Sequence, residues 1–476
     1  MPSILISNLI NNSTIRLSNN VVFIAALVLT EFAVSTTANG MGLMEAYEAA
    51  VANDSVYQSA THENEAGQQF KVIGRANLLP NISANYGYNR NNQDITTNNN
   101  NNSITDTRNY NSENGSIQLR QPIFNLESWA RYRQGNAQTN LSDKQLEVSK
   151  QALITRFFGL FASANYAEDV LALAKAARDG FKLQEDANKL MAVRGEGTKI
   201  ALIESQAKLS LSEAQVIEAE DNLTDSRNAL ALMLGKDVAA LDRLTDGFSV
   251  LTMQPTNLEE WKEIALAHNP EMAVQREAVE VASQEVKRNR AGHAPRLDAI
   301  ASISKSDSDT TSTFKQNIDT KSIGLQLNIP IYAGGAVSAL TAQAQANYLK
   351  SQDDLQTKTN EVLLDLRKQY NTLQSSTLRI DALKQSVASA ELLVAATKKS
   401  LIGGVRTNLD VLEARKQLFE TKRDLSLARY NYLVAYINLR KAAGTLTVAE
   451  LEKISPYFAR QARTSKVEED YYAVVP

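Results

Sequence analysis

The charged residues whose spacing is most informative follow a pair of glycines late in the chain. Arg406 comes two residues after Gly404, and Asp410 and Glu413 follow it at helical intervals. An arginine and an aspartate four residues apart share one face of a helix, where they form a surface ion pair worth only a few tenths of a kcal/mol. From this spacing alone, a local ion pair on one helix is the preferred interpretation.

Residues that perform catalysis form no recognisable motif. The sequence contains no cysteine, which excludes disulfides, zinc–thiolate sites and thiol chemistry. The three histidines, His62, His268 and His293, lie far apart and lack the spacing of metal ligands. Phosphate-binding glycine loops and the GxSxG and HExxH motifs are absent. We therefore expect no enzyme, no cofactor and no metal site, and the formal net charge of −3 does not indicate a nucleic-acid partner.

Two glycine turns join long proline-free segments that are typical of helices. The turns are Gly195-Glu196-Gly197 and Gly403-Gly404, and the segments around them are residues 129–194, 198–234, 336–402 and 407–443. At a rise of 1.5 Å per residue, each of the two longer segments would span about 100 Å. The pattern predicts two long helical hairpins.

The faces of these segments carry heptad repeats. In the last one, a row of large residues lies beside a row of small ones: Val411, Leu418, Leu425, Tyr432 and Leu439 beside Ala414, Thr421, Ala428, Ala435 and Ala442. Large and small residues at this spacing allow neighbouring helices to interdigitate closely. An ordinary amphipathic core helix would explain one such row, whereas several rows on long helices favour coiled-coil packing.

The chain contains an internal duplication. Gly195, Glu204 and Gly235 find counterparts in Gly404, Glu413 and Gly444 at one constant separation. We divide the chain accordingly into a first repeat at residues 40–254 and a second repeat at residues 255–455. Each repeat begins with a helical segment, at residues 43–77 or 258–292, which ends just before a proline.

Between the first helical segment and the long hairpin, each repeat carries two segments with the alternation of β-strands. Ile323, Leu325, Leu327, Ile329 and Ile331 alternate with polar or small residues, and residues 82–88 and 117–123 show the same period of two. Polar stretches at residues 90–115 and 304–321 are predicted to be exposed, mobile loops.

These strands predict a membrane barrel that several subunits share. Each chain supplies four strands of about ten residues, the length of a transmembrane β-strand. Four strands cannot close a barrel with a usable lumen, and an open sheet in lipid would leave unpaired edges. No segment after the N-terminal region is apolar enough for a transmembrane helix, so entry into a membrane would require a barrel. Three chains would give twelve strands, although composition alone does not select three.

Both ends of the chain are expected to lie outside the fold. Residues 21–29 form an apolar run after Arg16 and before small residues, which is the layout of a signal peptide in residues 1–39 with cleavage near residues 38–40. The alternative is an interfacial or buried apolar segment. Residues 456–476 are predicted to be a polar, poorly ordered tail.

Aromatic residues follow the second strand of each pair. They are Phe124, Trp129 and Tyr132 in the first repeat and Tyr332 in the second. Aromatic side chains gather at membrane–water interfaces, and we expect these four to mark one. Packing at the strand-to-helix corner is the open alternative.

The order of elements and several motifs resemble the TolC family of outer-membrane export channels. The motifs are residues 78–80 (LLP), 119–124 (LRQPIF), 327–335 (LNIPIYAGG), 404–407 (GVRT), 410–414 (DVLEA) and 428–433 (ARYNYL). The resemblance covers nearly all of residues 41–451. It implies a mainly α fold with a transmembrane β-barrel, in which a trimer forms a twelve-stranded barrel and an α-helical periplasmic tunnel. The function it implies is passive export through the outer membrane.

The resemblance also implies a gate at the tip of the tunnel, where the two glycine turns meet. Arg406 matches the family's gate arginine, and Asp410 and Glu413 match its acidic positions, which would favour cations in a narrow pore. Two positions depart from the family: Leu401 replaces a tyrosine and Ala201 replaces an aspartate. The gate is then expected either to use contacts of Glu196, Thr198 or Lys199 instead or to be weaker. Its expected hinge residues are Gly195, Gly197, Gly403 and Gly404.

The partners that the resemblance implies are sister subunits, outer-membrane lipid, a periplasmic adaptor and an inner-membrane transporter of the ABC or proton-driven kind. The sequence favours neither transporter type and does not identify the cargo. The rival interpretation is a periplasmic coiled-coil adaptor or scaffold of a transport complex. An adaptor would carry one hairpin with flanking β-rich domains, whereas this chain carries a duplicated unit.

Overall fold

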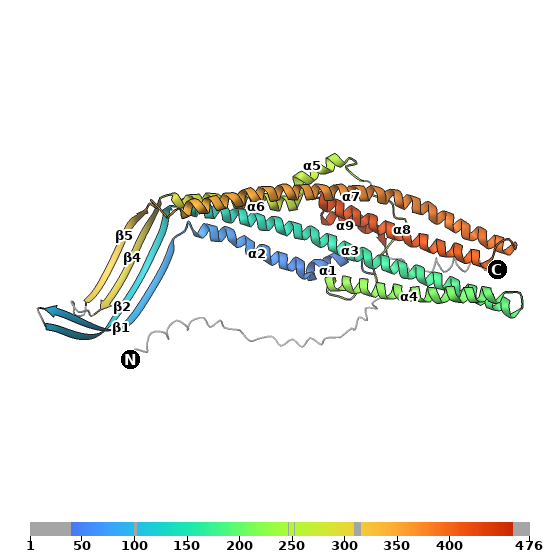
Figure 1. The fold of residues 1–476 in the computed structure, drawn as a ribbon, viewed down its shortest axis with the longest axis horizontal. Helices are drawn as coiled ribbons and strands as arrows, with labels where there is room; N and C mark the ends of the chain where they lie inside the picture. Colours follow the sequence, from blue (N-terminus) through green and yellow to red (C-terminus); the bar gives the residue numbers. More distant parts are fainter. Residues whose placement is uncertain (1–39, 100–101, 246, 252, 309–315, 460–476) are drawn as a thin grey trace, which may run out of the picture. The chain divides into compact units, whose positions relative to one another are not determined.

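The computed structural model describes residues 40–459, except residues 100–101, 246, 252 and 309–315. The predicted signal peptide lies outside the described residues, as does most of the predicted tail. Helices dominate, and Figure 1 shows them beside a four-stranded sheet. The helices are α1 (Leu43–Asn53), α2 (Ser55–Ala76), α3 (Leu126–Val193), α4 (Lys199–Leu234), α5 (Leu258–His268), α6 (Pro270–Arg290), α7 (Ala336–Ile402), α8 (Asn408–Ala442) and α9 (Val448–Ile454). Among the helices described, none is both long and apolar enough to cross a membrane.

The two long hairpins are present as predicted. Helices α3 and α7 contain 68 and 67 residues, and each turns back into a partner, α4 or α8. Gly195 and Gly404 occupy the turns with φ values of +74° and +75°, a conformation that side chains with a Cβ rarely adopt. Figure 1 shows both turns at the ends of α3 and α7 that lie away from the sheet.

The predicted helical segments at residues 43–77 and 258–292 are each broken into two helices, so the prediction of single helices was wrong. Asp54 ends α1 in an extended conformation, and its carboxylate accepts a hydrogen bond from the Tyr57 amide to cap α2. Asn269 does the same for α6, which starts with Pro270. Capping residues and a proline at the first helical position favour a new helix start over a continuous helix.

The sheet contains β1 (Asn81–Asn99), β2 (Asn102–Phe124), β4 (Arg296–Ser308) and β5 (Gln316–Asn328), in the order β1-β2-β4-β5 and antiparallel throughout. The polar stretch at residues 90–115, predicted to be a mobile loop, instead continues both strands as a hairpin, and residues 304–321 are largely strand as well. A ladder of backbone hydrogen bonds does not depend on side-chain polarity, so asparagine and threonine continue it.

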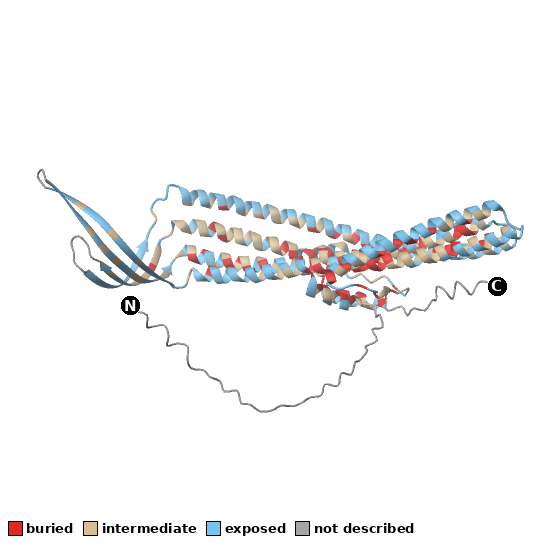
Figure 2. Cartoon of the chain, turned by 90° about the horizontal axis from the view of Figure 1, so that it is seen from below, coloured by how far each residue is buried: buried red, intermediate tan, exposed pale blue. Residues whose placement is uncertain are grey.

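A group of short elements packs against the middle of the long helices, and we call it the equatorial segment. It includes β3 (Arg243–Leu244) and β6 (Phe458–Ala459), which pair with each other, and helix α9. Its buried side chains join those of α1, α3 and α8 in the main hydrophobic core, which Figure 2 shows in red about midway along the helices. Phe458 is buried there and Phe458–Ala459 form β6, so the prediction that the tail begins at residue 456 was wrong for these residues.

Glycines allow the helices near the sheet to approach closely. A Cβ added at Gly135 of α3 would lie 2.4 Å from the Phe70 carbonyl oxygen of α2. In the other direction, a Cβ added at Gly67 of α2 would lie 2.0 Å from the Ser142 hydroxyl of α3. Small residues at a helix crossing bring the two backbones into contact and increase the packed area. The separation of α2 and α3 therefore depends on these glycines.

We predict opposite effects of alanine at two glycines of α3. Gly135→Ala should lower the free energy of unfolding by about 1–3 kcal/mol, because the added methyl group collides with the α2 backbone. Gly159→Ala should raise it by up to about 1 kcal/mol through helix propensity, since apart from the adjoining residues and backbone of its own helix no described atom lies within 4 Å of the added Cβ. Thermal unfolding in detergent, followed by circular dichroism, measures both. Equal shifts in the same direction would contradict the packing argument.

Candidate functional site

The second glycine turn leads into a well-capped helix start. The Thr407 hydroxyl accepts a hydrogen bond from the Asp410 amide at 3.3 Å, and the Asp410 carboxylate accepts bonds from the Thr407 amide at 2.7 Å and hydroxyl at 2.8 Å. This reciprocal arrangement is a capping box, which satisfies backbone donors that a helix start leaves unpaired. The carboxylate of Asp410 is thereby fixed at the tip.

Arg406 forms the local pair that its spacing predicts. Its Nη1 lies 3.5 Å from Oδ1 of Asp410, and the arginine side chain is 61% exposed. The hydrogen bond from the Thr407 amide is the main cause that lowers the pKa of Asp410 below its usual value, and Arg406 adds a smaller lowering effect. Most of the exposed guanidinium is free to meet a group from outside the subunit.

Glu413 connects the two hairpins within one subunit. Its carboxylate accepts a hydrogen bond of 2.7 Å from Nζ of Lys208 in α4. This bond is the largest cause that lowers the pKa of Glu413. Sequence reasoning missed Lys208, because nothing in the spacing along one helix identifies a partner on another. The only available signal was the charge of Lys208 next to the heptad position Leu209 of α4.

A small apolar cluster supports this connection. Ala177 and Phe181 of α3 are buried together with Leu412 of α8, and Leu209 and Phe419 pack against them. Beside the cluster, Nη1 of Arg415 donates a bond of 3.3 Å to the carbonyl oxygen of Gly180. The two hairpins are therefore held together near the tip by a few apolar side chains and polar bonds.

The residues of the first turn have local roles. The Thr198 hydroxyl accepts a bond of 3.1 Å from the Ala201 amide and caps α4, and the Glu196 amide donates to the Met191 carbonyl oxygen. Among the described residues, the side chains of Glu196 and Lys199 form no ion pair with the Arg406 turn. The part that these residues would play in a gate stays a prediction.

Farther from the glycine turns, Asp169 connects α3 to β3 and α8. Its carboxylate pairs with Arg243 of β3 and accepts hydrogen bonds from Ser426 at 2.7 Å and Tyr430 at 3.2 Å, both in α8. Burial is the main cause that raises the pKa of Tyr430, and Asp169 raises it further, so the phenol stays a donor. We name these four residues the equatorial joint.

At the other end of the helices, one face of the sheet is apolar and exposed. This apolar belt consists of Ile82, Ala84, Tyr86, Tyr88, Ile117, Leu119, Leu297, Ala299, Ala301, Ile303, Ile323, Leu325 and Leu327. Ile323 alone is 89% exposed in the isolated subunit. So much exposed aliphatic surface on a sheet requires an apolar environment.

The predicted interface aromatics lie where the belt meets the helices. Trp129 is about half exposed and contacts Tyr132 edge-on, with ring centroids 6.2 Å apart, while Phe124 and Tyr332 are exposed. Their role at a membrane surface stays a prediction. Tyr86 and Tyr88 lie at the far edge of the belt and are exposed, in agreement with the alternation that placed them on the apolar face.

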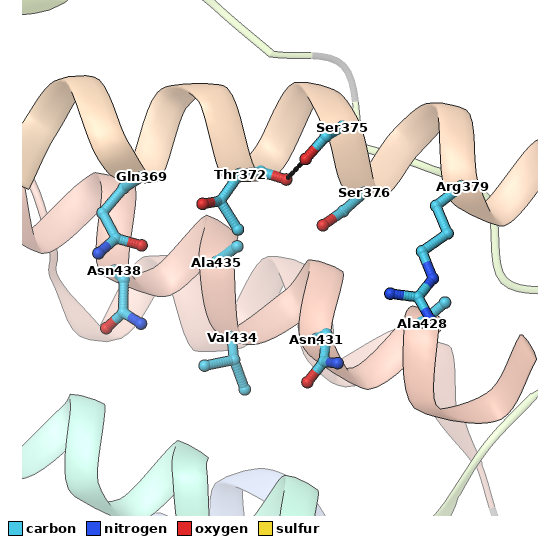
Figure 3. Close-up of a pocket in the computed structure, with 10 residues that line it drawn as sticks. All are labelled: Gln369, Thr372, Ser375, Ser376, Arg379, Ala428, Asn431, Val434, Ala435 and Asn438. Atoms are coloured by element: carbon cyan, nitrogen blue, oxygen red, sulfur yellow. Dashed lines mark hydrogen bonds between the residues drawn. The ribbon is translucent and has the colours of Figure 1, made fainter. Parts of the chain in front are cut away.

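A polar groove of about 520 Å³ runs between α7 and α8. Figure 3 shows that its lining is mainly hydroxyl and amide side chains with the Arg379 guanidinium at one end. These groups bind water or polar surfaces but include no acid–base pair or nucleophile with an activating base. Within the described ranges, no group of three acidic or histidine side chains lies close enough to hold a metal ion.

Comparisons with known proteins agree with this geometry. A family model described as "outer membrane efflux protein" matches residues 46–236 and 261–445. Alkaline protease secretion protein AprF of Pseudomonas aeruginosa is 39% identical over 420 residues, which cover 88% of this chain and 87% of AprF. Proteases secretion protein PrtF of Dickeya chrysanthemi is 36% identical and covers 89% of this chain and 92% of PrtF. The crystal structure of the CmeC outer membrane channel of Campylobacter jejuni covers 87% of this chain and 89% of CmeC with a TM-score of 0.75 at 18% identity.

We predict that the capping box controls the local stability of the second turn. Thr407→Ala should increase amide hydrogen exchange in the first turn of α8 by about fivefold, since the loss of an N-cap costs about 1 kcal/mol. Hydrogen exchange with mass spectrometry at constant pH measures it. The same change at Thr198 serves as the comparison and should affect only the start of α4. Unchanged exchange at α8 in Thr407→Ala would refute the structural role of the box.

Proposed function

Since this chain belongs to the outer membrane efflux protein family, we propose that it is the outer-membrane component of a type I secretion system whose cargo is a secreted protein such as a protease. Its coarser role follows from the family and from its relatives: it is an export duct in the outer membrane with a tunnel that extends into the periplasm. Similarity to AprF and PrtF over almost the whole of each chain is the observation that carries the proposed cargo.

The assembly we propose is a homotrimer. The outer edges of β1 and β5 have no neighbouring strand within the described subunit. In lipid these edges must pair, and β5 of one copy beside β1 of the next closes a twelve-stranded ring without a free edge. The exposed apolar belt supports this arrangement, because it would then face lipid all round.

We further propose that the tip is the gate of the duct. Contacts of Lys208 with Glu413 and of Arg415 with Gly180 hold α8 against the first hairpin, and Arg406 is placed to reach a neighbouring subunit. Opening requires α8 to move away from α4, which breaks these contacts. Charge-assisted bonds between exposed groups are reversible, so a docking partner needs to supply only a modest free energy.

We propose two further partners for the export complex. A periplasmic adaptor would contact the hairpins near the tip, and an inner-membrane transporter would supply the cargo and the energy. We favour an ABC transporter over a proton-driven one because the similarity to two protease secretion proteins indicates protein export. The duct itself carries out passive conduction, and no catalytic role is proposed for it.

Removal of the tip contacts should open the channel. Arg406→Ser and Lys208→Met should each increase the open fraction in planar bilayers at pH 7 by about fivefold or more, a typical coupling effect. Arg423→Ser, which removes an exposed arginine of α8 that pairs with its neighbour Asp424, is the matched control and should leave the open fraction unchanged. Unchanged gating in both tip variants would refute the gate.

The pH dependence of the open fraction provides a second test of the proposed gate. The pKa values of Asp410 and Glu413 lie below their usual values of 3.8 and 4.5. Both carboxylates therefore keep their contacts above these values, and the contacts are lost only as the pH falls through the lowered pKa values. The open fraction should stay constant from pH 7 to about pH 5 and increase in more acidic solution. An increase already near pH 6 would contradict this assignment.

The cargo is tested by complementation. In a strain that lacks the outer-membrane component of a protease secretion system, this chain should restore protease activity in the medium when the adaptor and ABC transporter are present. It should not restore drug resistance to a strain that lacks a drug-efflux channel. The reverse result would refute the proposed cargo, and the absence of a heat-sensitive oligomer band from outer membranes would refute the assembly.

A further inference from the structure

The two faces of the sheet differ in charge as well as in apolarity. Directly opposed residues of antiparallel strands lie on one face, so the register assigns every side chain to the apolar belt or to the opposite face. If the belt faces lipid, the opposite face lines the lumen of the barrel. We name it the inner face.

Hydroxyl and amide groups dominate the inner face. Cross-strand rows such as Asn85 with Ser116 and Ser304, or Gln118 with Ser302 and Ser322, run across the sheet. Between Ser302 and Ser322 the two hydroxyls form a hydrogen bond of 2.7 Å. Glycines and two isoleucines, Ile300 and Ile318, occupy other positions of this face.

Among the described residues of the four-stranded part, charged groups on the inner face lie only at the end near the helices, where they are paired. The two-stranded extension of β1 and β2 carries one further pair on this face, Arg108 with Asp106. Arg120 of β2 donates to Asp298 of β4 through Nε at 3.1 Å, and Asp298 is only 4% exposed. Arg296 lies 3.9 Å from the carboxylate of Glu127 at the start of α3. Along the rest of the four-stranded part, every described side chain of this face is uncharged.

The face that carries the belt has the opposite character beyond its apolar section. Its charged residues in the four-stranded part are Glu113, Lys305, Asp307, Asp319 and Lys321. The two-stranded extension adds Arg90 and Asp94 on this face. Beyond the paired charges near the helices, the described part of the four-stranded sheet therefore carries five charged residues on this face and none on the inner face. Charges outside the belt suit a hydrated membrane surface, whereas their absence inside leaves the passage without a fixed potential.

We propose that the barrel is an electrostatically neutral passage that does not select its cargo by charge, and that its hydroxyl and amide lining suits an extended polypeptide of either net charge. This inference rests on the proposed function and identifies the chemistry of the cargo that the barrel accepts. Side chains without charge cannot hold an acidic or basic segment by an ion pair, so such a segment is not retained in the barrel. Any charge selection then belongs to the tip, where Asp410 and Glu413 lie.

The experiment uses the absence of cysteine from the chain. Ser302→Cys on the inner face and Ile303→Cys on the belt are made singly in the full-length channel, which is reconstituted in lipid vesicles. Each is treated with methanethiosulfonate reagents that carry a trimethylammonium or a sulfonate group. At Ser302→Cys, the ratio of the two rates should lie within about threefold of the ratio for free cysteine, because a neutral wall changes the local ion concentration little. Ile303→Cys should react slowly with both reagents, because lipid covers the belt.

A charged variant shows that the measurement can detect a potential. Addition of Ser304→Asp to Ser302→Cys should shift the ratio by about tenfold towards the cationic reagent. A skewed ratio at Ser302→Cys alone, with Ile303→Cys protected, overturns the neutral passage and leaves the export duct intact. Failure of Ser302→Cys to react with either reagent also overturns it. Reaction of Ile303→Cys as fast as that of Ser302→Cys would instead show that the belt does not face lipid, and the proposed function would fail.

Discussion

Backbone hydrogen bonding within lipid is the constraint on which the rest of this structure depends. A sheet in a bilayer has no water to satisfy its edges, and each unpaired amide or carbonyl costs several kcal/mol. The four strands of one subunit form a continuous antiparallel ladder but leave the outer sides of β1 and β5 open. One subunit is therefore an incomplete structure in its membrane, and the proposed trimer closes the ring.

The helices extend from the sheet to the tip and pack against one another along the way. Strand β2 leads into α3 through the single residue Asn125, whose side chain caps the helix. Helices α2, α3, α6 and α7 then pack in sequence, in part through glycines that bring backbones into contact. The apolar core is concentrated at the equatorial segment, and towards the tip polar bonds and a small cluster replace it. We therefore expect local stability to decrease from the equator to the tip, which suits the proposed gate.

Most of this architecture could be predicted from the sequence, because long-range periodicity is a property of the chain itself. The absence of proline and the heptad rows defined α3, α4, α7 and α8 to within three residues. The alternation at residues 323–331 located β5, but the prediction was wrong about its ends, since the strand runs from Gln316 to Asn328. The strand extensions at residues 90–115 were wrongly predicted as loops, since asparagine-rich segments pair when a neighbouring strand provides the ladder. Contacts between distant elements, such as Lys208 with Glu413, were beyond prediction because one sequence contains no information on which helix faces lie opposite each other.

The equatorial joint has a geometric consequence for the tip. Ser426 and Tyr430 are bonded to Asp169 there, which leaves the stretch of α8 from Ser426 down to Asn408 to act as a lever. Its length is about 27 Å at 1.5 Å per residue, so a rotation of about 10° about the joint displaces the second turn by about 5 Å. A small angular change at a partly buried carboxylate is thereby converted into a displacement comparable to the diameter of a side chain, without any change in the helix itself.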